Sequence, residues 1–486
     1  MTVQITKSKI LSSLVWKFLE IAGSQGILLV IQIILARLLM PEDFGLIALV
    51  SVFIVVASVM VQSGLNTALI QKKDADATDI SSVFYISLIV AAVLYLIVFF
   101  CAPVIAIYYK EPQLTLILRV LMITLFASAF NSIQNVIVAK NMLFKKQFFS
   151  SVAAILFSGV LGITLAYNGF GVWALVIQQL TNRFSLTIIL FVTVKWRPQL
   201  LFSLKKVKLL YSYGWKLLVS ALIDTLYMNI YSLIVGKTFG TTTLGFFNRG
   251  EQFPKLFATN INGSIQAVMF PVLASQQDNH QRVKEMMRRS IVTSSFIVFP
   301  LMTGLAIVAE PLIKILLTER WLPAVPFLQY FCLLYSLLPI QTANLQAIIA
   351  LGRSDIFLKL EIIKKVVSII ILIFTVPHGV YAIVIGLCIS GIFSTLINIY
   401  PNLKLLNYSY IEQFKDIIPS MLISVTMGIL IYYIKWIEMS EIVTMFCQIF
   451  IGIILYIGIA KTFKVESYTY LLATLKSMLQ KTEKTH

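Results

Sequence analysis

Long apolar runs separated by short polar stretches recur along the chain from Leu14 to Ala460. A helix needs about 20 apolar residues to cross the roughly 30 Å hydrocarbon core of a bilayer. With Pro, Gly and clustered charges taken as boundaries, the pattern predicts fourteen spanning helices. We expect them at 14–39, 45–70, 80–104, 114–138, 148–167, 171–194, 209–236, 248–275, 290–311, 324–350, 356–376, 379–401, 414–436 and 441–461. The first run is too long for the apolar region of a cleaved signal peptide, so it counts as a span.

Composition agrees with this pattern. Of the 486 residues, 59% are hydrophobic and 12% are Asp, Glu, Lys or Arg, against about 25% in soluble domains. We therefore predict an all-α polytopic membrane protein. The four cysteines lie in apolar runs without CxxC spacing and the three histidines are scattered, so neither disulfides nor a metal nor another cofactor is expected.

Lys and Arg collect in alternate loops, and this bias predicts the orientation. Clusters such as Lys205-Lys206 and Arg288-Arg289 fall on one side, whereas the intervening loops carry single cations or none. Basic loops stay in the cytoplasm, so both termini are expected there. The net charge of +18 mostly expresses this bias, and we expect no nucleic-acid partner.

The chain resembles itself at an offset of about 200 residues. Arg37 lies eight residues before Gly45, as Lys237 lies eight residues before Gly245, and the segment 171–177 resembles 379–385. This repeat predicts two six-helix lobes, 1–200 and 201–405, related by a pseudo-two-fold axis along the membrane normal. Two extra helices and a cytoplasmic tail are left in 406–486. In such paired lobes, the substrate site lies between the lobes and one lobe rocks against the other.

Polar residues inside the spans are candidates for that site. A charge at mid-bilayer costs about 2.5–3.5 kcal/mol, so it is expected to face a cavity or a partner. Spacings of 4, 4, 3 and 4 put five polar residues of the seventh span on one helical face: Lys216, Ser220, Asp224, Tyr227 and Tyr231. A second stripe on the eighth span comprises Gln252, Lys255, Thr259, Asn262 and Gln266.

Cations outnumber carboxylates in the spans, which suits an anionic substrate because guanidinium and ammonium groups bind phosphate. The predicted substrate-binding residues are Lys17, Arg183, Lys216, Asp224, Tyr227, Lys255 and Asn262. Lys17 and Glu20 either line the cavity or neutralise each other as an i,i+3 pair. Arg183 either binds substrate or packs between helices. Glu20 and Asp224 are the carboxylates that would couple transport to an ion.

The sequence contains no complete catalytic motif. Gly236-Lys237-Thr238 resembles the end of a nucleotide-binding loop, but Tyr231 occupies the position that requires glycine. The loops on the predicted outer side are short and hold no nucleophile–base set. We therefore expect a transporter and not an enzyme.

Several segments carry a resemblance to a known family. They include Leu35–Gly45, Ala68–Lys72, Phe247–Gln252, Gly352–Asp355 and Leu360–Lys365. Over about residues 10–430 the chain resembles the Wzx-type polysaccharide flippases, and most closely their colanic and teichuronic acid exporter branch. These belong to the multidrug/oligosaccharidyl-lipid/polysaccharide exporter superfamily.

The resemblance implies translocation of an undecaprenyl-diphosphate-linked oligosaccharide repeat unit across the bacterial cytoplasmic (inner) membrane, by alternating access, for surface polysaccharide biosynthesis. It also implies a polymerase and glycosyltransferases as pathway partners. Its motif residues lie near helix ends and would act as gates or in helix turns; with the repeat-related Lys237 they are Arg37, Glu42, Asp43, Lys237, Arg249 and Glu251. An ion-coupled multidrug or cation antiporter of the same superfamily is the alternative, and it would need carboxylates in the first lobe.

Overall fold

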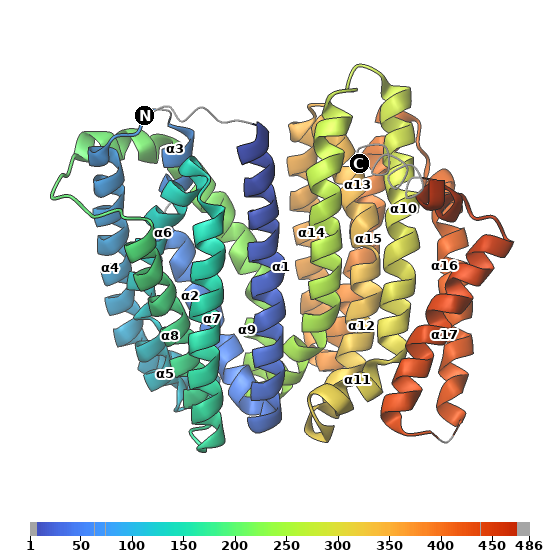
Figure 1. Cartoon of the computed structure of the whole chain (residues 1–486), viewed down its shortest axis with the longest axis horizontal. Helices are drawn as coiled ribbons and strands as arrows, with labels where there is room; N and C mark the ends of the chain where they lie inside the picture. Colours follow the sequence, from blue (N-terminus) through green and yellow to red (C-terminus); the bar gives the residue numbers. More distant parts are fainter. Residues whose placement is uncertain (1–6, 63, 73, 438, 474–486) are drawn as a thin grey trace. The chain divides into compact units, whose positions relative to one another are not determined.

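The computed structural model describes residues 7–62, 64–72, 74–437 and 439–473, and within them the chain is helical and contains no strand (Figure 1). The α-helices are α1 (Lys7–Leu38), α2 (Pro41–Gln62), α3 (Leu65–Gln71), α4 (Ala77–Tyr109), α5 (Leu114–Leu121), α6 (Thr124–Asn141), α7 (Phe144–Tyr167), α8 (Val172–Thr193), α9 (Leu204–Ala274), α10 (His280–Ile307), α11 (Ala309–Leu316), α12 (Val325–Ser336), α13 (Leu338–Ala350), α14 (Ser354–Thr375), α15 (Val380–Leu406), α16 (Tyr410–Tyr432) and α17 (Glu441–Thr462). Short 3-10 turns cover Glu319–Ala324, Val376–His378 and Tyr433–Trp436.

Twelve helical stretches of the described residues are long and apolar enough to cross a membrane, so the chain is a multi-pass membrane protein. The difference from the fourteen predicted spans has two causes. Predicted spans seven and eight both fall in α9, whose part Gly214–Ala274 counts as one stretch. The backbone leaves helical geometry at Gly240 (φ 85°), so α9 joins two helices across a kink. The predicted span at 356–376 corresponds to α14, which is not among the twelve because it carries five charged residues: Asp355, Lys359, Glu361, Lys364 and Lys365.

One predicted span ends at the wrong place. The predicted span 45–70 is broken, because α2 ends at Gln62 and Gly64 takes a left-handed conformation (φ 65°) before α3. The predicted spans 114–138 and 324–350 each correspond to one spanning stretch, Leu114–Asn141 and Glu319–Ala350. The first stretch contains α5 and α6, and the second contains α12 and α13. Pro339 stands in the first turn of α13, where a missing N–H costs no helical hydrogen bond.

By its internal packing the chain forms two compact units, Met1–Gly245 and Phe246–His486. The first, called unit 1 below, packs α1 on α7 and α7 on α8. In the second, unit 2, α10 packs against α12, α13 and α16. Figure 1 shows α16 and α17 as an antiparallel pair at the edge of unit 2. The division into lobes at residue 200 follows the sequence repeat and stays a prediction.

Two repeat-related glycines of unit 1 make reciprocal backbone contacts. A Cβ atom on Gly45 would lie 1.7 Å from the carbonyl oxygen of Thr241, and one on Gly245 would lie 2.1 Å from that of Pro41. Thr241 and Gly245 follow Pro41 and Gly45 by 200 residues each, so the contact has the reciprocity of a two-fold axis. Only glycine permits this approach, because any Cβ would overlap a backbone oxygen.

The first half of α9 is anchored in unit 1 near both of its ends. At its start, Lys206 pairs with Asp76, and a Cβ on Gly64 would lie 2.1 Å from the carbonyl oxygen of Gly214. Towards Gly240, Lys237 donates to the carbonyl of Tyr108, and the Thr241 hydroxyl donates to Glu111 at 2.7 Å. The stretch between these anchors carries the predicted polar face.

Candidate functional site

The predicted polar face of α9 is accessible at the end nearer its start and buried at the other. Lys216, Ser220 and Asp224 are exposed, Tyr227 is half-buried, and Tyr231 is 8% exposed. Helical periodicity aligns all five, as the sequence predicts, because α9 is regular over this stretch. The face therefore offers an ammonium, a hydroxyl and a carboxylate within two and a half turns.

The cations of the long apolar helices include two groups. Some have partners: Lys17 pairs with Glu20 at 2.8 Å, and Lys364 pairs with Glu361 at 2.5 Å. Arg119 donates to the carbonyl of Phe99 at 3.1 Å and stacks on its ring. These contacts satisfy the charge locally, so the neutral-pair interpretation of Lys17 and Glu20 is the one that the geometry favours.

Arg183 on α8 and Lys216 on α9 form the second group. Both side chains are exposed, and within the described part of the chain neither makes a hydrogen bond or an ion pair. Among the contacts of the described residues, no such bond joins Lys17, Arg183 and Lys216 to one another. An unpaired charge is costly in hydrocarbon, so these two side chains require water or an anion.

The second predicted stripe, on the later half of α9, is more strongly paired. Lys255 binds Glu251 at 3.1 Å, and Glu251 also accepts a hydrogen bond of 2.7 Å from the Tyr335 hydroxyl. Asn262 is 7% exposed, and its Oδ1 has no partner among the described residues. In this half of α9, the buried Asn262 Oδ1 can accept a hydrogen bond, whereas the charge of Lys255 is neutralised by Glu251.

Of the predicted gate or turn residues, Arg37, Glu42 and Asp43 lie at helix ends. The expected helix-end position was wrong for Lys237, Arg249 and Glu251, which lie inside α9 on either side of Gly240. Arg37 is exposed in the last turn of α1, and Glu42 is exposed in the first turn of α2. Asp43 accepts a hydrogen bond of 3.0 Å from the N–H of Met40, which stabilises the α1–α2 turn. Arg249 is buried and bonds Gln252. The Asp43 contact therefore stabilises a helix turn, whereas the Arg249 contact lies within α9.

A buried amide network in unit 2 was missed by the sequence analysis. Asn344 of α13 donates to Gln413 of α16 at 3.0 Å, and Asn402 of α15 donates to Asn344 at 2.9 Å. All three are 0% exposed. Asn398, one turn before Asn402, is also fully buried, and neither polar atom of its side chain has a partner among the described residues. The i,i+4 spacing of two asparagines in an apolar run was the available signal.

Outside the spanning helices, the Asp76–Lys206 pair fixes the start of α9. The hydrogen bond from Lys206 lowers the pKa of Asp76 from 3.8 to about 2. Asp76 and Asp79 also cap α4 reciprocally, with the Asp79 N–H donating to Asp76 at 2.8 Å. Asp76 therefore caps α4 and also anchors the start of α9.

Comparisons with known proteins supply the context. A family model described as "Polysaccharide biosynthesis protein" matches residues 34–326. The teichuronic acid biosynthesis protein TuaB of Bacillus subtilis is 27% identical over 308 residues, 62% of this chain and 63% of that protein, so the match spans less than two thirds of that relative. The lipopolysaccharide biosynthesis protein WzxC of Escherichia coli is 22% identical over 440 residues, 87% of this chain and 89% of that protein.

Two groups of solved structures share the fold. Lipid II flippase MurJ in an inward closed conformation superposes with a TM-score of 0.71 at 16% identity, covering 94% of this chain and 100% of that one. An inward-facing multidrug resistance transporter of the MATE family superposes with a TM-score of 0.60 at 16% identity, covering 81% and 99%. The predicted fold class is confirmed by these likenesses.

Proposed function

This chain belongs to the polysaccharide biosynthesis protein family, and we propose that it is a flippase for a lipid-linked oligosaccharide. The cargo would be an undecaprenyl-diphosphate-linked repeat unit, moved across the cytoplasmic membrane by alternating access. Its glycan would then enter surface polysaccharide synthesis, with a polymerase and glycosyltransferases acting on the same material. Both chain termini would face the cytoplasm, following the loop charges.

The relatives and the fold support this proposal jointly. Two relatives are a teichuronic acid and a lipopolysaccharide biosynthesis protein, and a solved structure with the same fold is a lipid II flippase. The antiporter alternative shares the fold through the multidrug transporter but has no support from the sequence relatives.

The observation that carries the proposal is the pair of unpaired cations, Arg183 and Lys216. Each is exposed on a spanning helix without a protein partner among the described residues. A diphosphate supplies the oxygens that a guanidinium binds bidentately and that an ammonium binds as a point charge. Ser220 and Asp224, on the same face as Lys216, would hydrogen-bond sugar hydroxyls. We assign the head group of the cargo to these residues.

The reciprocal contact of Gly45 and Gly245 suits a gate. Two helix segments touch backbone to backbone there, and side chains larger than hydrogen would hold them apart. In an alternating-access cycle, this contact would be made in one state and opened in the other. Glu20, paired with Lys17, and Asp224 stay the candidates for ion coupling.

A cell that lacks the protein tests the function directly. We expect lipid-linked repeat units to accumulate on the cytoplasmic face while surface glycan disappears, measured by lipid extraction and by lectin access in inverted vesicles. Unchanged surface glycan without accumulation would overturn the proposal. Drug sensitivity of the deletion strain with normal glycan would favour the antiporter alternative.

Lys216→Ala tests the site. Removing a charge-assisted contact of about 1.5–3 kcal/mol should lower export about 10- to 100-fold at normal protein level. Lys208→Ala is the matched control, because Lys208 is an exposed lysine two turns earlier on the same helix. Equal export by the two variants would remove Lys216 from the site and leave the function itself untouched.

A further inference from the structure

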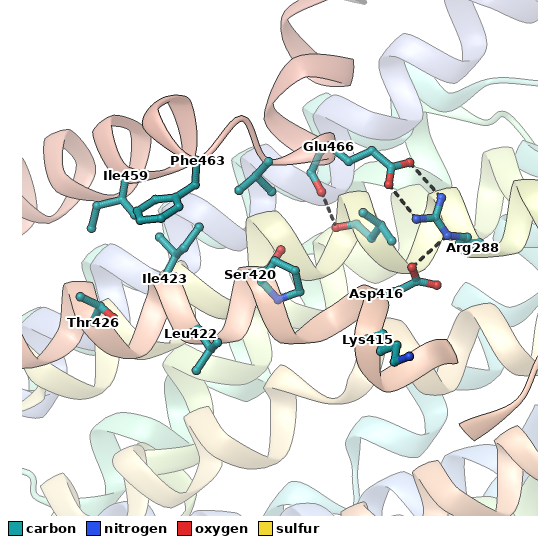
Figure 2. Close-up of a pocket in the computed structure, with 14 residues that line it drawn as sticks. Arg288, Lys415, Asp416, Ser420, Leu422, Ile423, Thr426, Ile459, Phe463 and Glu466 are labelled. Carbon is teal, nitrogen blue, oxygen red and sulfur yellow. Dashed lines mark hydrogen bonds and ion pairs between the residues drawn. The ribbon is translucent and has the colours of Figure 1, made fainter. Parts of the chain in front are cut away.

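A pocket of unit 2 lies between α10, α16 and the segment that follows α17, and the transport proposal does not use it (Figure 2). Its volume is about 580 Å³. Figure 2 shows Arg288, Asp416 and Glu466 gathered at one end, and Ile459, Phe463, Ile423 and Leu422 at the other. The pocket is thus charged at one end and apolar along the rest.

The charged end is built around the guanidinium of Arg288. Nη1 and Nη2 of Arg288 donate to the two oxygens of Glu466 at 2.9 and 2.7 Å, and Nε donates to Asp416 at 2.9 Å. A parallel pair of bonds from guanidinium to carboxylate has the geometry by which arginine also binds phosphate. Glu466 therefore occupies the position that a phosphate group would take on this arginine.

The two carboxylates differ in how firmly they are held. The Asp416 side chain is 13% exposed and also accepts a hydrogen bond of 2.7 Å from Tyr408. The Glu466 side chain is 62% exposed, four residues beyond the end of α17, and Arg288 is its ion-pair partner. An exposed ion pair contributes about 0–1 kcal/mol, so Glu466 is the carboxylate that a ligand can replace.

The charges that line the pocket limit the net charge of a ligand that can bind there. The pocket lining contains two cations, Arg288 and Lys415, against two carboxylates, Asp416 and Glu466. When Glu466 leaves, one net positive charge remains. A phosphodiester carries one negative charge and neutralises it, whereas a diphosphate would leave further negative charge uncompensated.

The apolar end fits a hydrocarbon chain. Leu422 and Phe463 are 56% and 76% exposed. Ile423 and Ile459 line the same wall, between α16 and α17. The Arg288 guanidinium therefore lies next to an apolar surface. On a membrane protein, these two features match a lipid, which has a charged head group and an acyl chain.

We propose that this pocket binds an anionic glycerophospholipid, whose phosphate replaces Glu466 on Arg288 while an acyl chain lies between α16 and α17. Glu466 then acts as a built-in competitor that closes the site when the lipid is absent. The inference goes beyond glycan transport and does not rest on it, because lipid binding is measured without any flipping assay.

Binding of dioleoyl phosphatidylglycerol to the purified full chain in detergent, followed by native mass spectrometry, tests the proposal. The wild type should bind phosphatidylglycerol in preference to dioleoyl phosphatidylcholine. Glu466→Gln should bind it about tenfold more tightly, because the competing charge is gone, and Arg288→Gln should lose the preference. Arg282→Gln is the matched control on α10, since Arg282 is exposed outside the pocket.

Two further binding experiments distinguish which phosphate-containing ligand the pocket prefers. Glycerol 3-phosphate should not displace phosphatidylglycerol, because it lacks the chain; efficient displacement would overturn the lipid assignment. Tighter binding of undecaprenyl diphosphate than of phosphatidylglycerol would also overturn it, in favour of the cargo lipid. If Arg288→Gln unfolds, Glu466→Gln decides alone. A phosphatidylglycerol affinity equal to that of the wild type would show that Glu466 does not compete with the lipid, and would overturn the proposal.

Discussion

Two sets of polar side chains inside the helices, one in unit 1 and one in unit 2, differ in exposure and in hydrogen bonding. On α8 and α9 of unit 1, Arg183 and Lys216 are exposed and bind nothing among the described residues. On α13, α15 and α16 of unit 2, Asn344, Asn402 and Gln413 are fully buried and bind one another. Both sets are polar groups that hydrocarbon cannot solvate.

The difference teaches how to separate binding from packing in an apolar chain. Buried amides that satisfy each other hold helices together, so their loss should lower stability. Exposed cations without a partner contribute nothing to packing, so their loss should affect only what binds them. Exposure together with the absence of a partner is therefore the useful criterion, and polarity alone is not.

The largest effect should come from Arg183→Gln. Loss of a bidentate guanidinium contact should lower export about 10- to 100-fold, with a thermal midpoint close to that of the wild type. Arg119→Gln is the control within unit 1, because Arg119 is an intramembrane arginine with partners, the carbonyl and ring of Phe99. It should lose stability and keep export per folded molecule. If the two variants behave alike, the comparison fails.

Asn402→Leu probes the buried side of the comparison. The substitution leaves Oδ1 of Asn344 without the donor at 2.9 Å, so the free energy of unfolding should fall by about 1–3 kcal/mol. Lys404→Ala, at an exposed position of the same helix, should change it by no more than about 0.5 kcal/mol. Thermal unfolding in detergent measures both. A stable Asn402→Leu protein that cannot export would place the network in the site.

Asp76→Asn should have the smallest effect, since Asp76 and Lys206 are paired but exposed. Lys206 holds the folded-state pKa of Asp76 at about 2, below its ordinary 3.8. The stabilising contribution is therefore complete above about pH 4 and lost as the pH falls towards 2. Thermal midpoints of the wild type should exceed those of Asp76→Asn slightly at pH 6 and converge at low pH. A gap that widens on acidification contradicts this linkage.

Much of the fold was predictable, because each spanning helix is determined by residues that are close together in the sequence. Length, apolarity and flanking charges gave fourteen helical segments, and the errors fell where a local rule was ambiguous. Gly64 and Gly240 both take positive φ, 65° and 85°, and both interrupt helical geometry. Gly64 falls inside the predicted span 45–70 and was missed, whereas Gly240 falls between two predicted spans, where a break was expected.

The candidate site was predictable in part. Helical spacing alone aligned Lys216, Ser220 and Asp224 on one face of α9. It did not separate Lys17, neutralised by Glu20, from Arg183, which has no such neighbour among the described residues. Four polar residues of the spans in unit 2 passed without notice: Asn344, Asn398, Asn402 and Gln413.

By itself the sequence determined a helical membrane protein with an internal repeat and an excess of cations in its spans. These properties depend on residues within one helix or on composition. Only the tertiary structure decided which polar groups have partners, because the partners come from helices far apart along the chain. Asn344 and Gln413 are separated by 69 residues, and Arg288 and Glu466 by 178. Burial and pairing arise when helices pack, and they distinguish a charge that holds the fold from one left to bind a ligand.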